Sequence, residues 1–200
     1  MKKTFLFLAV LFLMTSCSDA QRGNFFMWQN AAKTCDQYNV GDVYQGGKIA
    51  YFFQSGDVGY IAGECHGIIA AETDQDSSGT TWGTYTLISG TSSAIGSGLT
   101  NTNAIVANQG AGTYAARLCY DLVLNGYSDW FLPSKDELSI LYINRTVIGN
   151  FVTGGFSNGG YWSSTEDNTT QSCTHQFDTN HQGSSIKLSP YFHVRAIRYF

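Results

Sequence analysis

The sequence has no apolar run long enough to cross a membrane as a helix. Its longest run, residues 5–14, has ten residues, about half of the roughly 20 that a spanning helix needs. The run follows two lysines and precedes the small residues Thr15 and Ser16, which is the pattern of a secretory signal peptide. We therefore expect residues 1–16 to be a signal peptide and the chain to be exported.

Charge is also scarce, and positive charge most of all. Only 13% of the residues are charged, and removal of the signal peptide would leave 15 acidic residues against nine basic ones, a net charge near −6. This balance excludes nucleic acid as an expected partner. The 22 glycines and the 14% of aromatic residues indicate one domain rich in turns, not a helical bundle.

No Cys-x-x-Cys pair is present, which excludes the usual zinc and redox motifs of that type. Beyond the signal peptide and Cys17, the cysteines are Cys35, Cys65, Cys119 and Cys173. An even number in an exported chain suggests up to two disulfides, and all three pairings stay open. A buried free thiol is the alternative for each.

Signatures of catalysis are missing too. There is no glycine-rich phosphate loop and no Gly-x-Ser-x-Gly elbow. Asp74–Gly79 matches the start of a calcium loop, but the twelfth position is Tyr85 where a glutamate is required, so we interpret it as a solvated acidic turn. The adjacent Cys65 and His66 would point to opposite faces of a strand, which suits neither nucleophile nor base. We expect no enzyme, no cofactor and no metal, and we interpret the histidines as exposed polar residues: His66, His175, His181 and His193.

The order of predicted elements is strands, helices, then strands again, which indicates an α+β fold with mixed, mostly antiparallel sheets and two to three helices. Residues 17–40 show no period and are expected to be a tether. The expected strands are a hairpin over 43–53 that turns at Gly46-Gly47, then 59–71, 161–165, 175–177, 186–188 and 194–200. The expected helices are 103–108, 114–124 and one that starts after Pro133 with the capping box Ser134–Glu137. Residues 72–101 are expected to be long loops.

Two resemblances suggest an identity. Met14-Thr15-Ser16-Cys17 resembles the bacterial lipobox, which implies that Cys17 carries lipid and that the protein is anchored at the outer membrane or cell surface by lipid alone. The segments GYSDWFLPSKDEL at 126–138, YWSSTE at 161–166 and VRAIRYF at 194–200 together resemble the C-terminal domain of bacterial collagen-like adhesins. That resemblance covers residues 41–200, and it implies a C-type-lectin-like fold and a role in surface binding. It also implies that the segments 44–53 and 194–200 lie in the same sheet.

Residues 167–193 also resemble the variable region of proteins diversified by a retroelement, because a Tyr-Trp-Ser-Ser start and a Val-Arg-Ala-Ile-Arg end bracket them. The resemblance implies a fixed scaffold at Gln176-Phe177, Gln182 and Lys187, with Cys173 standing where such sequences often carry tryptophan. Diversification is a hypothesis that composition leaves open.

We expect residues 167–193 to form the ligand-binding face. A period of two would turn Ile186 and Leu188 inward and Lys187 outward. The expected ligand contacts are Asn168, Thr170, His175, Asn180, His181, Ser185, Tyr191 and His193, with Tyr191 as the main anchor. Trp130 and Trp162 are expected to serve the fold, and Arg195 and Arg198 to share one face of the last strand.

The expected function is therefore an adhesin-like or receptor-like lipoprotein that binds an unknown protein or glycan on another cell, a phage or a host. Two alternatives stay open. A structural or tip subunit of a surface assembly would recruit its neighbour through an exposed edge strand. A hydrolytic enzyme would need buried ionisable groups gathered in one pocket.

Overall fold

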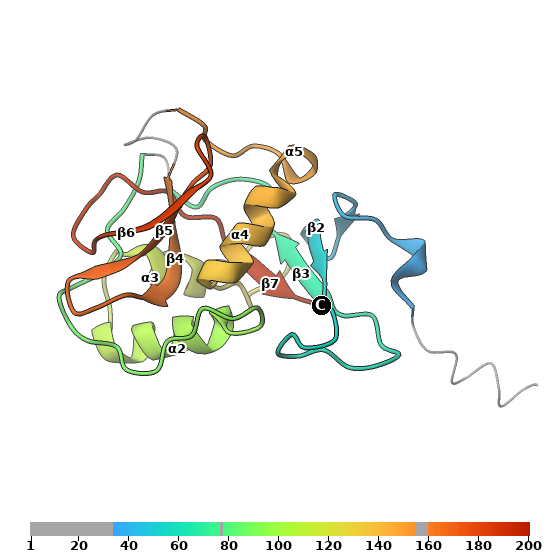
Figure 1. Ribbon diagram of the computed structural model, residues 1–200, viewed down its shortest axis with the longest axis horizontal. Helices are drawn as coiled ribbons and strands as arrows, with labels where there is room; N and C mark the ends of the chain where they lie inside the picture. Colours follow the sequence, from blue (N-terminus) through green and yellow to red (C-terminus); the bar gives the residue numbers. More distant parts are fainter. Residues whose placement is uncertain (1–33, 77, 155–159) are drawn as a thin grey trace, which may run out of the picture. The chain divides into compact units, whose positions relative to one another are not determined.

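The computed structural model describes residues 34–76, 78–154 and 160–200, and within them it has two antiparallel sheets (Figure 1). The first sheet has the order β1-β2-β3-β7 and the second the order β4-β5-β6. The strands are β1 Val43–Tyr44, β2 Gly47–Phe52, β3 Gly67–Ala70, β4 Gly160–Glu166, β5 Gln171–Gln176, β6 His181–Ile186 and β7 Ile197–Tyr199. The helices are the 3-10 helix η2 Cys35–Gln37 and the α-helices α2 Gly98–Gln109, α3 Ala115–Tyr120, α4 Lys135–Ile143 and α5 Arg145–Ile148.

The predicted α+β class is confirmed, and so is the antiparallel character of both sheets. The predicted number of helices is too low, because the described residues contain four α-helices. The one that sequence reasoning missed is α5, whose four residues are too few to show a helical period. None of the helices in the described ranges is long and apolar enough to span a bilayer.

The opening hairpin and the closing strand share one sheet, as predicted. β3 lies between β2 and β7, with Ile69 paired to Ile49 on one side and to Arg198 on the other. The hairpin turns at Gln45-Gly46, both at positive φ, one residue earlier than predicted. Gly47 already belongs to β2 and must be small, since a Cβ there would lie 2.3 Å from the carbonyl oxygen of Ala70.

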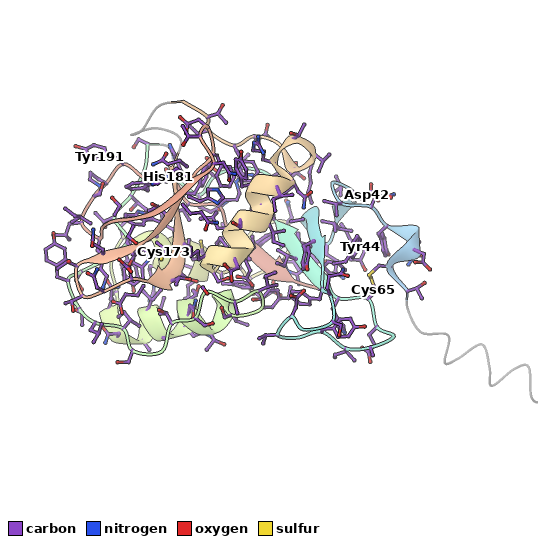
Figure 2. The ribbon with its side chains drawn as sticks, in the orientation of Figure 1. Asp42, Tyr44, Cys65, Cys173, His181 and Tyr191 are labelled. Carbon is purple, nitrogen blue, oxygen red and sulfur yellow. A yellow bond between two sulfur atoms is a disulfide. The ribbon has the colours of Figure 1, made fainter. Side chains whose placement is uncertain are left out.

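The strand predicted over 59–71 is shorter, and the residues before it form turns that end in a disulfide. Cys65 is bonded to Cys35 in η2 (Figure 2). Cys119 and Cys173 are free thiols, both buried, so the two fates that the sequence left open both occur. Cys65 is thereby excluded as a nucleophile.

The predicted capping box of α4 is confirmed. The backbone N–H of Glu137 donates to Oγ of Ser134 at 3.3 Å, and the backbone N–H of Ser134 donates to Oε2 of Glu137 at 2.7 Å. Glu137 is fully buried, and its Oε1 also accepts from Gly96 N and from the hydroxyl of Tyr199. Burial raises the pKa of this carboxyl. The cap therefore also fastens α4 to the neighbouring loop and to β7, and Figure 1 shows α4 crossing between the two sheets.

The long loops predicted over 72–101 are largely confirmed, but they take part in the core. Trp82 and Trp162 are completely buried, and each donates its indole N–H to a backbone carbonyl of the other's segment, at Ser163 and Thr80, both at 2.8 Å. Trp130 is buried nearby in the same cluster. The predicted structural role of Trp130 and Trp162 thus agrees with their positions.

Candidate functional site

The side chain of Asp76, in the loop between β3 and α2, is buried beneath the end of the segment 167–193. One carboxylate oxygen accepts from the backbone N–H of Gly79 at 2.5 Å and from Nδ1 of His193 at 2.9 Å, and the other accepts from the backbone N–H of Val194 at 2.7 Å. The side chains of Asp76 and His193 are 6% and 9% exposed. This contact holds the chain at the point where it enters its last strand.

The side chain of Asp74 is buried in the same loop and binds Arg195. Its carboxylate accepts from Nε of Arg195 at 2.7 Å and from the hydroxyl of Tyr161 at 2.8 Å. Burial raises the pKa of Asp74 although the guanidinium opposes that change. The predicted solvated acidic turn is therefore wrong, because both aspartates are enclosed by residues from the end of the chain.

The predicted placement of the two arginines is also wrong. Arg195 precedes β7, is fully buried and also donates to the carbonyl oxygens of Ala71, Gly149 and Asn150. Arg198 lies within β7 and binds Asp129 at 2.7 and 2.8 Å. The two therefore lie in different surroundings and do not share a strand face.

A buried ion pair lies at the other end of the segment, between Lys187 and Glu166. Their side chains are 0% and 5% exposed. The Lys187 ammonium donates to Glu166 and to the carbonyl oxygen of Thr86, and it lies 4.7 Å from the centre of the Trp82 ring. The carbonyl oxygen of Lys187 accepts from the backbone N–H of Trp82 at 2.8 Å. Lys187 thus joins the segment after β6 to the loop that contains Trp82 and Thr86.

This pair reverses the orientation predicted from the period of two. Ile186 and Leu188 are 51% and 49% exposed, whereas Lys187 between them is buried. The reason is that the side facing the interior here holds a carboxylate and a backbone carbonyl, which an ammonium can satisfy and an aliphatic side chain cannot. The prediction that Ile186 and Leu188 hold the segment to the scaffold is wrong, and Lys187 does so in their place.

The structure divides the predicted contact residues into three groups by exposure. Ser185 is half-buried, and His175 and His193 are buried. The remaining five are exposed: Asn168, Thr170, Asn180, His181 and Tyr191. His181 and Tyr191 both lie at the end of the domain far from Asp42 and Tyr44 (Figure 2). The role of the eight residues in ligand contact stays a prediction, but the expected exposure of His175 and His193 is wrong.

His175 is buried because β5 packs against α4 at this position. The centroid of its ring lies 4.8 Å from the ring centroid of Tyr142 and 5.4 Å from that of Phe177. Its Nε2 is 3.0 Å from Oδ1 of Asn180. Burial, with a smaller effect of nearby Arg145, lowers the pKa of His175. A neutral His175 therefore fixes the turn between β5 and β6, where Asn180 adopts a positive φ of 58°.

The turn before β5 is fixed in a similar way by Asn168. Its Oδ1 accepts from the backbone N–H of Thr170 at 2.9 Å, from the Thr170 hydroxyl at 3.0 Å and from the backbone N–H of Gln171 at 3.0 Å. Such a side-chain turn orders an exposed loop without a core. Both ends of β5 thus carry exposed residues on an ordered backbone.

Sequence reasoning missed two exposed apolar residues, Tyr85 and Leu87, which flank Thr86. They are 47% and 55% exposed. The bonds from Lys187 to Thr86 and from Trp82 to Lys187 join the loop that contains them to the segment that contains Ile186 and Leu188. An aromatic and a leucine inside a stretch of Gly, Ser and Thr were the available signal. We define the display surface as the exposed residues Tyr85, Leu87, Asn168, Thr170, Asn180, His181, Ile186, Leu188 and Tyr191.

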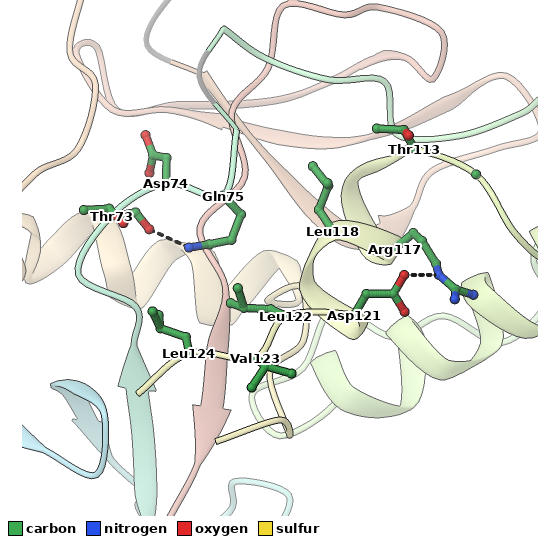
Figure 3. Close-up of a pocket in the computed structure, with 11 residues that line it drawn as sticks. Thr73, Asp74, Gln75, Thr113, Arg117, Leu118, Asp121, Leu122, Val123 and Leu124 are labelled. Carbon is green, nitrogen blue, oxygen red and sulfur yellow. Dashed lines mark hydrogen bonds and ion pairs between the residues drawn. The ribbon is translucent and has the colours of Figure 1, made fainter. Parts of the chain in front are cut away.

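A pocket of about 500 Å³ lies elsewhere, between the loop at 73–75 and the segment 112–124 (Figure 3). Its polar groups are mostly bonded to one another, since Gln75 donates to the carbonyl oxygen of Thr73 and Arg117 donates to Asp121 at 2.6 Å. Of the buried carboxylates and histidines above, only Asp74 lines it. Within the described ranges no three His, Cys, Asp or Glu side chains are placed to hold a metal ion.

The comparisons with known proteins add no identity to this geometry, because no family model and no curated protein matches the chain.

Proposed function

We propose that the chain is a lipid-anchored protein of the bacterial outer membrane or cell surface that binds a ligand through the display surface. Its domain would have a C-type-lectin-like fold, as the resemblance to collagen-like adhesins implies. The ligand would be a protein or glycan on another cell, a phage or a host.

One observation carries this proposal: the display surface is exposed while the backbone beneath it is held by buried polar contacts. The Lys187–Glu166 pair holds one part, and the Asp76–His193 pair holds another. Exposed apolar residues on two adjoining loops are typical of interaction sites, because a partner that covers them removes apolar surface from water, which is favourable. A backbone that is already ordered loses less conformational entropy when the ligand binds.

The hypothesis of diversification by a retroelement has support from burial. Three of the residues expected to form a fixed scaffold, Gln176, Phe177 and Lys187, are buried, while Gln182 is exposed. Exposed positions between them could change without a loss of packing. The test lies in the genome: a near-identical template repeat and a reverse transcriptase gene should adjoin this gene, and their absence would end the hypothesis.

Binding is tested with beads that carry the purified protein, offered to immobilised glycans and to intact bacterial and phage particles. In the triple variant Leu87→Ser, Leu188→Ser, Tyr191→Ser we expect at least about a tenfold loss of binding, because buried aromatic and aliphatic anchors carry most of the energy of an interface.

A matched control replaces three exposed apolar residues outside the display surface: Tyr120→Ser, Val123→Ser, Ile143→Ser. It should bind as the unchanged protein does. Equal loss in both triple variants, or in neither, would remove the display surface as the binding site.

The anchor is tested separately. Cys17 lies outside the described residues, and Cys17→Ser should leave the protein unprocessed or released from the membrane. The lipoprotein proposal fails if this variant stays in the membrane fraction at full level and resists extraction by salt.

A further inference from the structure

β6 is an edge strand of the second sheet, because its one partner there is β5. His181, Gln182, Ser184 and Ile186 are exposed, and the other two residues of the strand are half-buried. The strand contains no Asp, Glu, Lys, Arg or Pro, which are the residues that usually keep an edge from pairing.

The opposite edge of this sheet is closed. The backbone N–H of Trp162 donates to the carbonyl oxygen of His193 at 3.0 Å, and the backbone N–H of His193 donates to that of Gly160 at 2.8 Å. In the first sheet, β7 exchanges two backbone hydrogen bonds between Ile197 and Phe131. Among the described edge strands that are longer than two residues, β6 is thus the one whose outer side forms no such backbone hydrogen bonds.

The same hydrogen bonds determine which groups of β6 point outward. Gly160 and Trp162 direct their backbone groups to His193, so Tyr161 between them must bond to its partner His175 in β5. The neighbours of His175 in β5 then bond to β6, through the pairs Thr174–Gly183 and Gln176–His181.

The backbone N–H of Lys187 donates to the carbonyl oxygen of Thr170, which continues this alternation by one more pair beyond the strands. The N–H and C=O groups of Gln182 and Ser184 therefore point away from β5. No backbone hydrogen bond within the described ranges reaches them.

We propose that two copies of this protein pair through β6, antiparallel, about a twofold axis at Gly183. In that register Gln182 of each copy lies opposite Ser184 of the other and exchanges two hydrogen bonds with it, so that the two sheets become one of six strands. Gly183 of one copy then lies opposite Gly183 of the other, as a non-hydrogen-bonded pair. The Cα atoms of such a pair approach to about 4.5 Å, and a glycine leaves room for that approach.

Charge favours a second copy as the occupant of this edge. The whole chain carries a net charge of −4, yet the strand that would face its own copy has no fixed charge, so like charges do not meet. A closed pair also leaves no free edge for further growth. The inference does not rest on ligand binding, although His181 and Ile186 of β6 also belong to the display surface. It fits the alternative function as a subunit of a surface assembly.

The pair should be weak in solution. A strand pairing of six residues a side buries less than the roughly 1,200 Å² of a standard stable interface. The test must therefore trap the pair rather than rely on its affinity.

The full-length variant Gly183→Cys is the trap, under mild oxidation and with non-reducing electrophoresis as the readout. At the axis the two new cysteines would lie within the Cα distance of about 4.4–6.8 Å that a disulfide needs. The new Cβ would meet Nε2 of His181 at 3.0 Å, which is the end of an exposed side chain that can move.

The matched control is Ser185→Cys, on the same strand and the same face. In the proposed register Ser185 of each copy lies opposite His181 of the other. The two substituted positions, one in each copy, are then about four residues apart along the strands, roughly 13 Å at strand spacing. We expect at least about tenfold more covalent dimer from Gly183→Cys than from Ser185→Cys or from the unchanged chain. Equal amounts would overturn the proposal.

A second change separates pairing from folding. Ser184→Pro removes an outward N–H and leaves the ladder to β5 intact, a position where an edge strand tolerates proline. Added to Gly183→Cys, it should abolish the covalent dimer with little change in melting temperature. A covalent dimer that persists with proline at 184 would overturn the proposal.

Discussion

Replacement of Lys187 by methionine should destabilise the domain more than the same replacement at an exposed lysine would. The substitution keeps the length of the side chain but leaves the Glu166 carboxylate, 5% exposed, without its cation. Glu166 keeps one partner, the backbone N–H of Ile88 at 2.9 and 3.0 Å from its two oxygens. Loss of one member of a buried ion pair costs about 3–5 kcal/mol, and the contact with Trp82 is lost as well.

For a domain of this size, about 1 kcal/mol corresponds to roughly 2–4 °C in melting temperature, so Lys187→Met should lower it by about 6–20 °C. The assay is thermal unfolding followed by circular dichroism. Lys48→Met is the matched control, because the half-buried Lys48 also donates to a backbone carbonyl, that of Val147 at 3.1 Å, but through a hydrogen bond that is exposed to solvent. There the loss should be within about 1 kcal/mol.

The pairwise nature of the effect is tested by Glu166→Gln combined with Lys187→Met. Removal of both charges leaves no unpaired ion, so the double variant should be more stable than the sum of the single losses predicts, by about 1–3 kcal/mol. The reasoning is refuted if Lys187→Met melts at the same temperature as Lys48→Met, or if the two single losses simply add.

Three further predictions concern the scaffold. Deletion of residues 194–200 removes β7 and the Asp74–Arg195 pair and should leave a chain without a cooperative melting transition; a truncated protein that melts as the full chain does would contradict the role of β7. Reduction of the disulfide between Cys35 and Cys65, which are 30 residues apart, should cost up to about 3–4 kcal/mol, measured by urea unfolding with and without reductant, and an unchanged midpoint would show that this end is held by other contacts. Burial lowers the pKa of His175, so its contribution to stability is full above the unfolded pKa of about 6.5 and is lost as the pH falls through the folded value; the unchanged protein should therefore lose more stability than His175→Gln between pH 7.5 and 5.5, and parallel pH profiles would contradict this.

Local signals were sufficient for much of the fold. The capping box at Ser134 and Glu137 depends on residues three apart, so it could be predicted without knowledge of the fold. The opening hairpin needs only a tight turn between two β-rich segments. The pairing of the closing strand in the same sheet came from a resemblance and not from local pattern, and the structure agrees with it.

Contacts between distant residues account for what the sequence did not reveal. Asp74 and Asp76 looked solvated because their partners Arg195 and His193 lie 121 and 117 residues further on. The pairing of Cys35 with Cys65 is likewise one of several that spacing allows. Each of these depends on the fold, which brings the ends of the chain together.

The predicted orientation of Lys187 was wrong for a related reason. A period of two tells which residues alternate, but not which set faces the interior. The hydrophobic pattern favoured Ile186 and Leu188, whereas the interior at this place offers the carboxylate of Glu166. Both apolar residues are thus left on the surface, and both are part of the display surface.

The central claim is that exposed residues of the segment 167–193 are displayed on a backbone that does not depend on their side chains. The exceptions are Asn168 and Thr170, which bond to each other in the turn before β5, and Asn180, which binds His175. A library with random codons at the other exposed positions, His181, Ile186, Leu188 and Tyr191, shown on cells and sorted for protease resistance, tests the claim most directly. The account predicts that most clones stay as resistant as the unchanged protein, while a parallel library at Phe177, Lys187 and His193 is almost entirely digested. Equal survival of the two libraries, or digestion of both, would contradict it.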